Sequence, residues 1–388
     1  MEIFYPTNAA EVTEIVTKAK AKSSAGHDDI SIKTLKIAIK EVANVLAHLI
    51  NQIFKTGIFP DRLKISKIVP IFKKGNKKLV TNYRPISLLS VFSKIIERIM
   101  HTRLYGFLTV TGKISSTHHG FLTGRNTATA HLQLLKRIIE NHETGKESLV
   151  ILLDLSKAFD MVDHEILLSI LGEAGIKDKA HGLMETYLAD RKQYVTIENN
   201  LGKACSGLQE IDLGVPQGST LGPLLFLLYV NKISKVIAAD EIVQYADDTA
   251  IIISAADQSD LYKKYQMVMG EVSKYFESLR LILNIEKTQI LYFSKNSEAN
   301  LHDLTTVDSA KYLGVYFDTK LKWNPHTDYE KDTCHPKLAN QEKYTHHPTL
   351  DDQKKYKRHP KLANQRKYTC HPKLANQEKY TRHPNLVN

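Results

Sequence analysis

The sequence contains few cysteines and no long apolar run. Only 3 of its 388 residues are cysteine, too few for the disulfide framework of a small secreted domain and in keeping with a reducing compartment. The longest apolar block, 221–230, is about half as long as a membrane-spanning helix. The acidic, polar start of the chain lacks the basic and apolar segments of a signal peptide. We therefore expect a soluble intracellular protein, cytoplasmic and/or nuclear, with no membrane segment.

Excess positive charge is confined to parts of the chain. The formal net charge is +11, but residues 1–330 hold 40 basic and 37 acidic side chains, whereas residues 331–388 hold 13 and 5. Within the first part, residues 61–84 carry eight basic side chains and one acidic one. Such a stripe is typical of a phosphate-contacting surface and equally of a solvated loop, so its composition alone does not separate the two.

The end of the chain is a twelve-residue repeat. His-Pro pairs recur with their histidines at positions 335, 347, 359, 371 and 383. One Leu and one Tyr in twelve residues cannot bury a face of a helix or strand, so residues 327–388 are predicted to be disordered. Three interpretations stay open: weak nucleic-acid binding by a basic tail, metal binding by its histidines and cysteines, or no function.

Apolar periodicity predicts an α+β fold for the rest of the chain. Helices are expected at 8–22, 31–54, 87–109, 125–143, 164–174, 219–233 and 258–282. Strands are expected at 148–155, 193–198, 209–215, 241–246, 250–254, 288–293 and 311–317. This order of elements predicts an antiparallel sheet with helices on one face, rather than a doubly wound parallel sheet.

Three aspartates border apolar strands. Asp154 ends the apolar run 149–153, and Asp247 and Asp248 lie at the turn of a predicted hairpin. A carboxylate at the end of a buried strand is costly unless it is paired or binds a metal, and oxygen ligands favour Mg²⁺ or Mn²⁺ over zinc. Turn chemistry alone explains an Asp-Asp pair. The third carboxylate on a separate strand therefore favours a two-metal phosphoryl or nucleotidyl transfer site.

Six segments resemble, in their order, the motifs of one enzyme family. They are Asn82–Leu89, Asp154–Asp160, Gly214–Ser219, Tyr245–Asp248, Leu283–Thr288 and Tyr312–Val315. The chain resembles, from about residue 20 to residue 326, the reverse transcriptase of non-LTR retrotransposons, especially jockey-like elements. The resemblance implies a right-hand polymerase with an N-terminal segment and fingers at 1–145 and a palm at 146–326. It also implies an RNA template, a DNA primer and dNTPs as partners.

The resemblance implies catalytic roles for five residues. Asp154, Asp247 and Asp248 match the family's metal-binding carboxylates, and the backbone carbonyl of Leu155 matches a further ligand. Together they would bind two Mg²⁺ ions, with Mn²⁺ as a substitute. Lys287 matches a lysine that protonates the leaving pyrophosphate as a general acid.

The resemblance also implies residues that bind substrates. Those for the incoming nucleotide are Lys73, Lys74, Arg84, Phe159, Gln217 and Gly218. Those for the template are Arg125 and Asn126. Phe159 matches an aromatic gate that leaves no room for a ribose 2′-hydroxyl. The forked guanidinium of Arg84 suits a phosphate, and Gly218 allows a close backbone approach to a ligand.

The sequence departs from the family in ways that weaken part of this interpretation. His118 and His119 precede Gly120-Phe121, where the family commonly has Gln, and Leu122 stands where it has Arg. No endonuclease domain is recognised, so that activity would have to come from elsewhere. The resemblance ends near 323–326, where a thumb should begin. The alternative is a truncated, catalytically inactive remnant that only binds nucleic acid.

Overall fold

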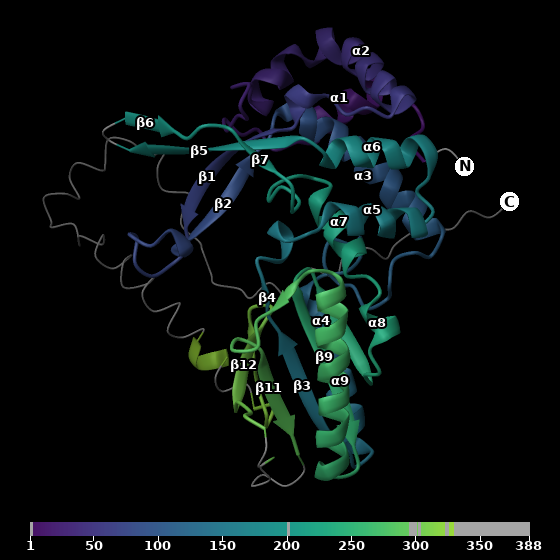
Figure 1. Ribbon diagram of the computed structural model, residues 1–388, viewed down its shortest axis with the longest axis vertical. Coiled ribbons are helices and arrows are strands. Elements are labelled where there is room, and N and C mark those ends of the chain that lie inside the picture. Colours follow the sequence, from purple (N-terminus) through teal and green to yellow (C-terminus); the bar gives the residue numbers. More distant parts are fainter. Residues whose placement is uncertain (1–2, 200–201, 295–300, 302–303, 323–325, 330–388) are drawn as a thin grey trace, which may run out of the picture. The chain divides into compact units, whose positions relative to one another are not determined.

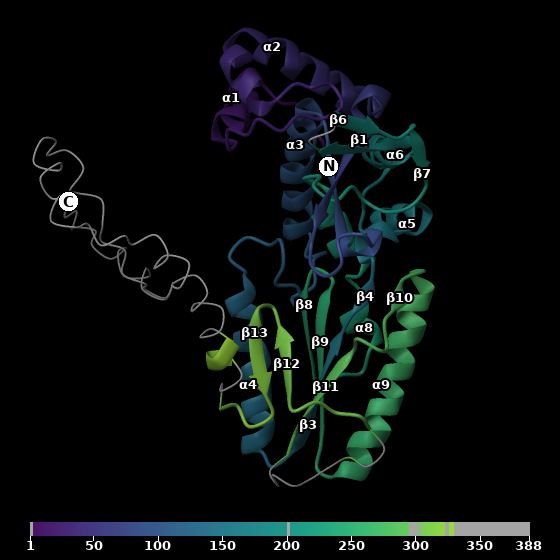
Figure 2. The ribbon, with the colours of Figure 1, turned by 90° about the vertical axis from the view of Figure 1, so that its left-hand side faces the viewer.

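Two larger sheets and the helices around them make up the described part of residues 1–326 (Figure 1, Figure 2). The computed structural model describes residues 3–199, 202–294, 301, 304–322 and 326–329. The twelve-residue repeat, predicted to be disordered, lies outside the described residues. Among the helices that the structure describes, none is long and apolar enough to span a membrane.

Three helices from the first 110 residues pack together. They are α1 (Ala9–Lys18), α2 (Ile32–Thr56) and α3 (Val91–Val110). Each begins at a polar side chain that accepts a backbone hydrogen bond from its first turn: Asn8, Ser31 and Ser90. The buried Arg103 of α3 forms an ion pair at 2.8 Å with the partly exposed Glu11 of α1, so a charged contact joins these two helices.

The first sheet has the strand order β2–β1–β5–β6, and β7 also pairs with β5. Its strands are β1 (Ile65–Phe72), β2 (Tyr83–Leu88), β5 (Arg191–Asn199), β6 (Gly202–Cys205) and β7 (Gln209–Ile211). The basic segment 61–84 is therefore mostly the β1–β2 hairpin. The helix expected from residue 87 begins only at Val91, because Pro85 favours an extended backbone before it and β2 pairs with β1 up to Leu88.

One strand of this sheet comes from the middle of the chain. β5 lies in the segment predicted as palm, yet it pairs in parallel with β1 of the segment predicted as fingers, with Ile68 opposite Val195. The division into fingers and palm near residue 145 stays a prediction.

The second sheet is antiparallel and has the order β11–β3–β9–β8. Its strands are β3 (Glu147–Leu153), β8 (Glu241–Tyr245), β9 (Asp248–Ala255) and β11 (Gln289–Phe293). Mixed helices and antiparallel strands confirm the α+β class.

Helices cover both faces of the second sheet, so the prediction of helices on one face is wrong. Leu149 and Ile151 of β3 share a core with α9 (Gln258–Ser278), whereas Val150 and Leu152 share a core with α4 (Thr127–Glu143). Successive side chains of a strand point to opposite faces, so an uninterrupted apolar run indicates burial on both. Figure 2 shows α4 and α9 on opposite sides of the sheet.

The remaining elements connect these sheets. The helices are α5 (His164–Glu173), α6 (Asp178–Leu188), α7 (Gly222–Tyr229) and α8 (Ile233–Val236), with short 3₁₀ turns η1 (Asp61–Leu63), η2 (Val80–Asn82) and η3 (Ala158–Asp160). The strands are β4 (Leu155–Ser156), β10 (Ile282–Leu283), β12 (Ser309–Tyr312) and β13 (Val315–Asp318).

The helix expected at 219–233 is two helices, α7 and α8. The strand expected at 311–317 is a hairpin, because Leu313 and Gly314 have the positive φ angles (48° and 91°) that a two-residue turn requires.

Candidate active site

The three aspartates lie together at one end of the second sheet. Leu153, the last residue of β3, pairs with Thr249 of β9, so the antiparallel register places Asp154 beside Asp248. Asp248 is the first residue of β9 and pairs with Tyr245, while Asp247 lies in the two-residue turn between them. The carboxylates are distant in sequence, and the pairing of β3 with the β8–β9 hairpin makes them neighbours.

The electrostatics of this site favour a bound cation. The pKa of Asp248 is raised to about 6, mainly because the surrounding protein excludes water from the carboxylate, and also because of the negative charges of Asp247 and Asp154. In the described part of the chain, no group of three or more His, Cys, Asp or Glu side chains is arranged so that it could hold a metal ion. The negative charges of the three neighbouring carboxylates nevertheless oppose one another, and a cation between them would relieve that repulsion.

Lys287 adds a positive charge to the same site. Its ammonium lies 3.8 Å from Oδ2 of Asp154, and 70% of the lysine side chain is exposed. Asn284 connects the segments that carry these two residues, because its N–H donates to the Asp154 carbonyl at 2.8 Å and its side chain accepts from the Lys287 N–H at 3.1 Å. An exposed pair contributes little to stability, so the contact leaves the ammonium available to a substrate.

Gln244 and Gly120 support the turn that carries Asp247, and the sequence analysis did not identify either role. Gln244 is fully buried; its backbone bonds to Thr117 and His119, and its side chain accepts from the Thr117 hydroxyl at 2.8 Å. A Cβ at Gly120 would lie 2.9 Å from the backbone nitrogen of Ala246. Ala246 has a φ of 58°, a strained conformation that persists only where surrounding contacts hold it.

The loop that contains Gln217 and Gly218, here the nucleotide loop, forms hydrogen bonds with the segment that carries Phe159. The ring of Phe159 stacks on that of Phe226 with centroids 4.4 Å apart, and its carbonyl accepts from the Val215 N–H at 2.9 Å. The side chain of Gln217 donates to Asp160 at 2.9 Å. Hydrogen bonds therefore connect the segment of Phe159, the residue implied as the sugar gate, with the loop implied to bind the nucleotide.

The same loop contacts β2. The Gln217 carbonyl accepts from the Ser87 N–H at 2.9 Å, and a Cβ at Gly218 would lie 2.8 Å from the Ser87 carbonyl oxygen. Gly218 also has a φ of 119°, which side chains other than hydrogen strongly disfavour. The glycine therefore allows the loop backbone to lie close to β2, the strand that carries Arg84.

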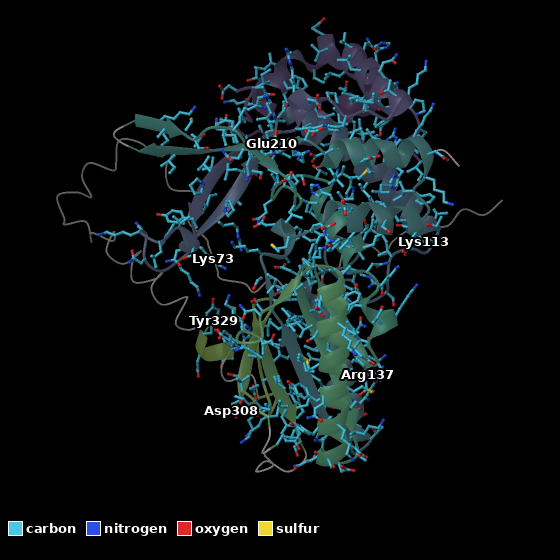
Figure 3. The ribbon with its side chains drawn as sticks, in the orientation of Figure 1. Lys73, Lys113, Arg137, Glu210, Asp308 and Tyr329 are labelled. Carbon is cyan, nitrogen blue, oxygen red and sulfur yellow. The ribbon has the colours of Figure 1, made fainter. Side chains whose placement is uncertain are left out.

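The three basic residues implied for the triphosphate lie on the exposed β1–β2 hairpin. Lys73 follows β1, and Arg84 of β2 pairs with Ile71 of β1. Figure 3 labels Lys73 near the end of this hairpin. Within the described ranges, neither Lys73, Lys74 nor Arg84 forms an ion pair with an acidic side chain. Their charges are therefore free to meet a phosphate.

Arg125 and Asn126, the residues implied for the template, make contacts within the protein. The Arg125 guanidinium donates to the carbonyls of Ser116 and, at 2.6 Å, His118. Asn126 caps α4 in a reciprocal arrangement with Thr129. These bonds order the start of α4 whether or not a template is present, so a template contact stays a prediction.

A family model described as reverse transcriptase (RNA-dependent DNA polymerase) matches residues 71–317. The chain belongs to the reverse transcriptase family. The matched residues contain all six motif segments, and they include the neighbouring carboxylates, the nucleotide loop and the β2 strand that contacts it.

Named relatives confirm the resemblance to non-LTR retrotransposon proteins. The chain is 28% identical over 349 residues to a probable RNA-directed DNA polymerase from transposon BS of Drosophila melanogaster, and 26% identical over 343 residues to the RNA-directed DNA polymerase from mobile element jockey of the same species. These alignments cover 86% and 85% of this chain but only 38% and 37% of those proteins. Among solved structures, apo telomerase from Candida tropicalis aligns with a TM-score of 0.47 and 13% identity, over 73% of this chain and 53% of that one.

Proposed function

We propose that this chain carries out RNA-directed DNA synthesis for a non-LTR retrotransposon. The 3′-hydroxyl of a DNA primer attacks the α-phosphate of a dNTP that is paired with an RNA template. The new O3′–P bond forms as the bond from the α-phosphorus to pyrophosphate breaks. The position of Asp154 beside Asp247 and Asp248, in a chain of the reverse transcriptase family, is the observation that supports this proposal most strongly.

We assign the metal site to Asp154, Asp247 and Asp248, with the carbonyl of Leu155 as a further ligand. The donors are all oxygen, which suits Mg²⁺ and allows Mn²⁺, and burial together with the negative charges of Asp247 and Asp154 raises the pKa of Asp248. Two bound ions would activate the attacking hydroxyl and stabilise the charge on the leaving group. Lys287, beside Asp154, donates a proton to an oxygen of the departing pyrophosphate.

The other implied residues select and hold the nucleotide. Lys73, Lys74 and Arg84 bind the triphosphate from the β1–β2 hairpin, since their charges are exposed and free of acidic partners in the described residues. Phe159 packs under the sugar and excludes a 2′-hydroxyl, while the loop of Gln217 lies against the nucleotide. The stacking of the Phe159 ring on Phe226 supports this role, because it holds the ring in one position.

A primer-extension assay tests the proposal. With an RNA template, a DNA primer, dNTPs and Mg²⁺, the wild-type chain should extend the primer, and Asp247→Asn should abolish the product. Asp260→Asn is the matched control, because Asp260 is exposed on α9 and, among the described residues, its only ion pair is with Lys263 at 3.3 Å. This variant should extend the primer like the wild type. A folded wild-type chain that binds template but extends no primer would refute the proposal and favour the non-catalytic remnant.

A further inference from the structure

A carboxylate outside the metal site is completely buried. Glu97 of α3 has no exposed surface. Its Oε2 accepts from the Thr220 N–H at 2.6 Å, and its Oε1 accepts from the Tyr187 hydroxyl at 3.1 Å and more weakly from the Ser93 hydroxyl at 3.4 Å. A single side chain thus joins α3 to α6 and to the segment that precedes α7.

A buried arginine accompanies this carboxylate. Arg191 is 1% exposed and its guanidinium carbon lies 5.0 Å from the centre of the Tyr187 ring. Its Nη1 donates to the Tyr187 carbonyl at 3.1 Å, whereas Nε and Nη2 have no hydrogen-bond partner among the described residues. Replacing buried ionisable side chains by apolar ones is often neutral or stabilising, so stability alone explains Glu97 and Arg191 poorly.

The backbone that Glu97 holds belongs to the nucleotide loop. Thr220 follows Gly218 by two residues, and the loop's other fixed point is the hydrogen bond from Ser87 to Gln217. Ser87 lies on β2 and Glu97 on α3, the next helix along the chain, so one continuous segment forms hydrogen bonds with the loop at two points. Burial raises the pKa of Glu97, and its Oε2 can accept the Thr220 N–H in either protonation state.

We propose that Glu97 is a positioning residue for the incoming nucleotide: by accepting the Thr220 N–H, it holds Gln217 and Gly218 at the distance from Phe159 that nucleotide binding requires. This inference rests on the proposed polymerase function. It concerns the affinity for dNTP rather than the bond-making step, because Glu97 touches neither the carboxylates nor Lys287.

The chain offers a matched control on the same helix. Arg103 is buried to a similar degree and its ion pair with Glu11, at 2.8 Å, ties α3 to α1 rather than to the loop. Arg103→Gln and Glu97→Gln each replace a buried ionisable side chain by an amide. Both variants should lower the melting temperature, but only the second should act on the nucleotide loop.

Two measurements test the inference: the KM for dNTP in primer extension, and the hydrogen exchange of a peptide spanning residues 217–222 in the free protein. Glu97→Gln should raise the KM by about tenfold, as expected when a buried hydrogen bond is weakened, with kcat changed by less than about threefold. Glu97→Ala should raise it further and speed the exchange of the loop. Arg103→Gln should leave both values as in the wild type.

The outcomes separate this inference from the polymerase proposal. Extension by the wild type, with KM and loop exchange unchanged in Glu97→Gln and Glu97→Ala, would overturn the role of Glu97 alone. If the wild type extends no primer, the polymerase proposal fails, and the exchange data still decide whether Glu97 holds the loop. Equal loop exchange in Glu97→Ala and Arg103→Gln would then overturn the inference, whereas faster exchange only in Glu97→Ala would support its structural basis.

Discussion

Replacing Asp248 by Asn should stabilise the metal-free protein while abolishing its activity. In the folded state the pKa of Asp248 is raised from 3.8 to about 6, so folding favours the protonated form. The contribution of this group to stability is complete below pH 3.8 and is lost as the pH rises through about 6. At pH 7.5 the ionised carboxylate therefore destabilises the fold, and Asn removes the charge.

The magnitude follows from the size of the shift. About two pKa units correspond to at most about 3 kcal/mol. Asp248 is an exposed residue, and solvent screens its interactions, so we expect about 1 kcal/mol. Denaturant unfolding of the wild type and Asp248→Asn in EDTA, at pH 4 and pH 7.5, measures the difference in unfolding free energy. The variant should gain stability relative to the wild type only at the higher pH, and added Mg²⁺ should stabilise the wild type more.

The pH dependence is the decisive part of this experiment. Asn itself changes strand propensity and hydrogen bonding, but those effects are the same at both pH values. A difference in unfolding free energy that is equal at pH 4 and pH 7.5 would refute the conclusion that the pKa of Asp248 is raised in the folded state. It would also remove the main electrostatic argument for a cation at this site.

Three further predictions concern the nucleotide site. Phe159→Ala should admit ribonucleotides, seen as a higher ratio of kcat/KM for rNTP to that for dNTP; an unchanged ratio would exclude the gate role. Gly218→Ala should lower the unfolding free energy by about 1–3 kcal/mol and impair extension, because its Cβ would meet the Ser87 carbonyl; wild-type stability would show that β2 moves easily. Arg84→Ala should raise the KM for dNTP without a change in melting temperature, since the side chain is exposed; an unchanged KM would remove it from the triphosphate site.

Local patterns predicted the second sheet well and the first sheet poorly. The apolar run 149–153 predicted β3, and the resemblance predicted that Asp154 would serve together with Asp247 and Asp248. The β1–β2 hairpin was missed because lysines interrupt its apolar residues and prolines lie in both strands. The α6 helix was missed because its sequence, 178–188, contains charged residues and a glycine that weaken the apolar periodicity.

The supporting contacts of the site were beyond any local pattern. Glu97 and Thr220 are 123 residues apart, and Thr117 and Gln244 are 127 apart. Each of these side chains has an ordinary polar character in its own segment, and its role appears only when the partner is known. The polar groups that position a site are therefore harder to predict than the carboxylates that form it, whose spacing follows a motif.

The parallel pairing of β1 with β5 constrains how the protein is made. During synthesis, the β1–β2 hairpin emerges from the ribosome long before its neighbour β5 exists. Until then the free edge of β1 offers unpaired backbone groups to any other strand, which is a common route to aggregation. A fragment ending at residue 145 would keep that open edge permanently, so recombinant expression of the first sheet requires the polypeptide at least as far as β7.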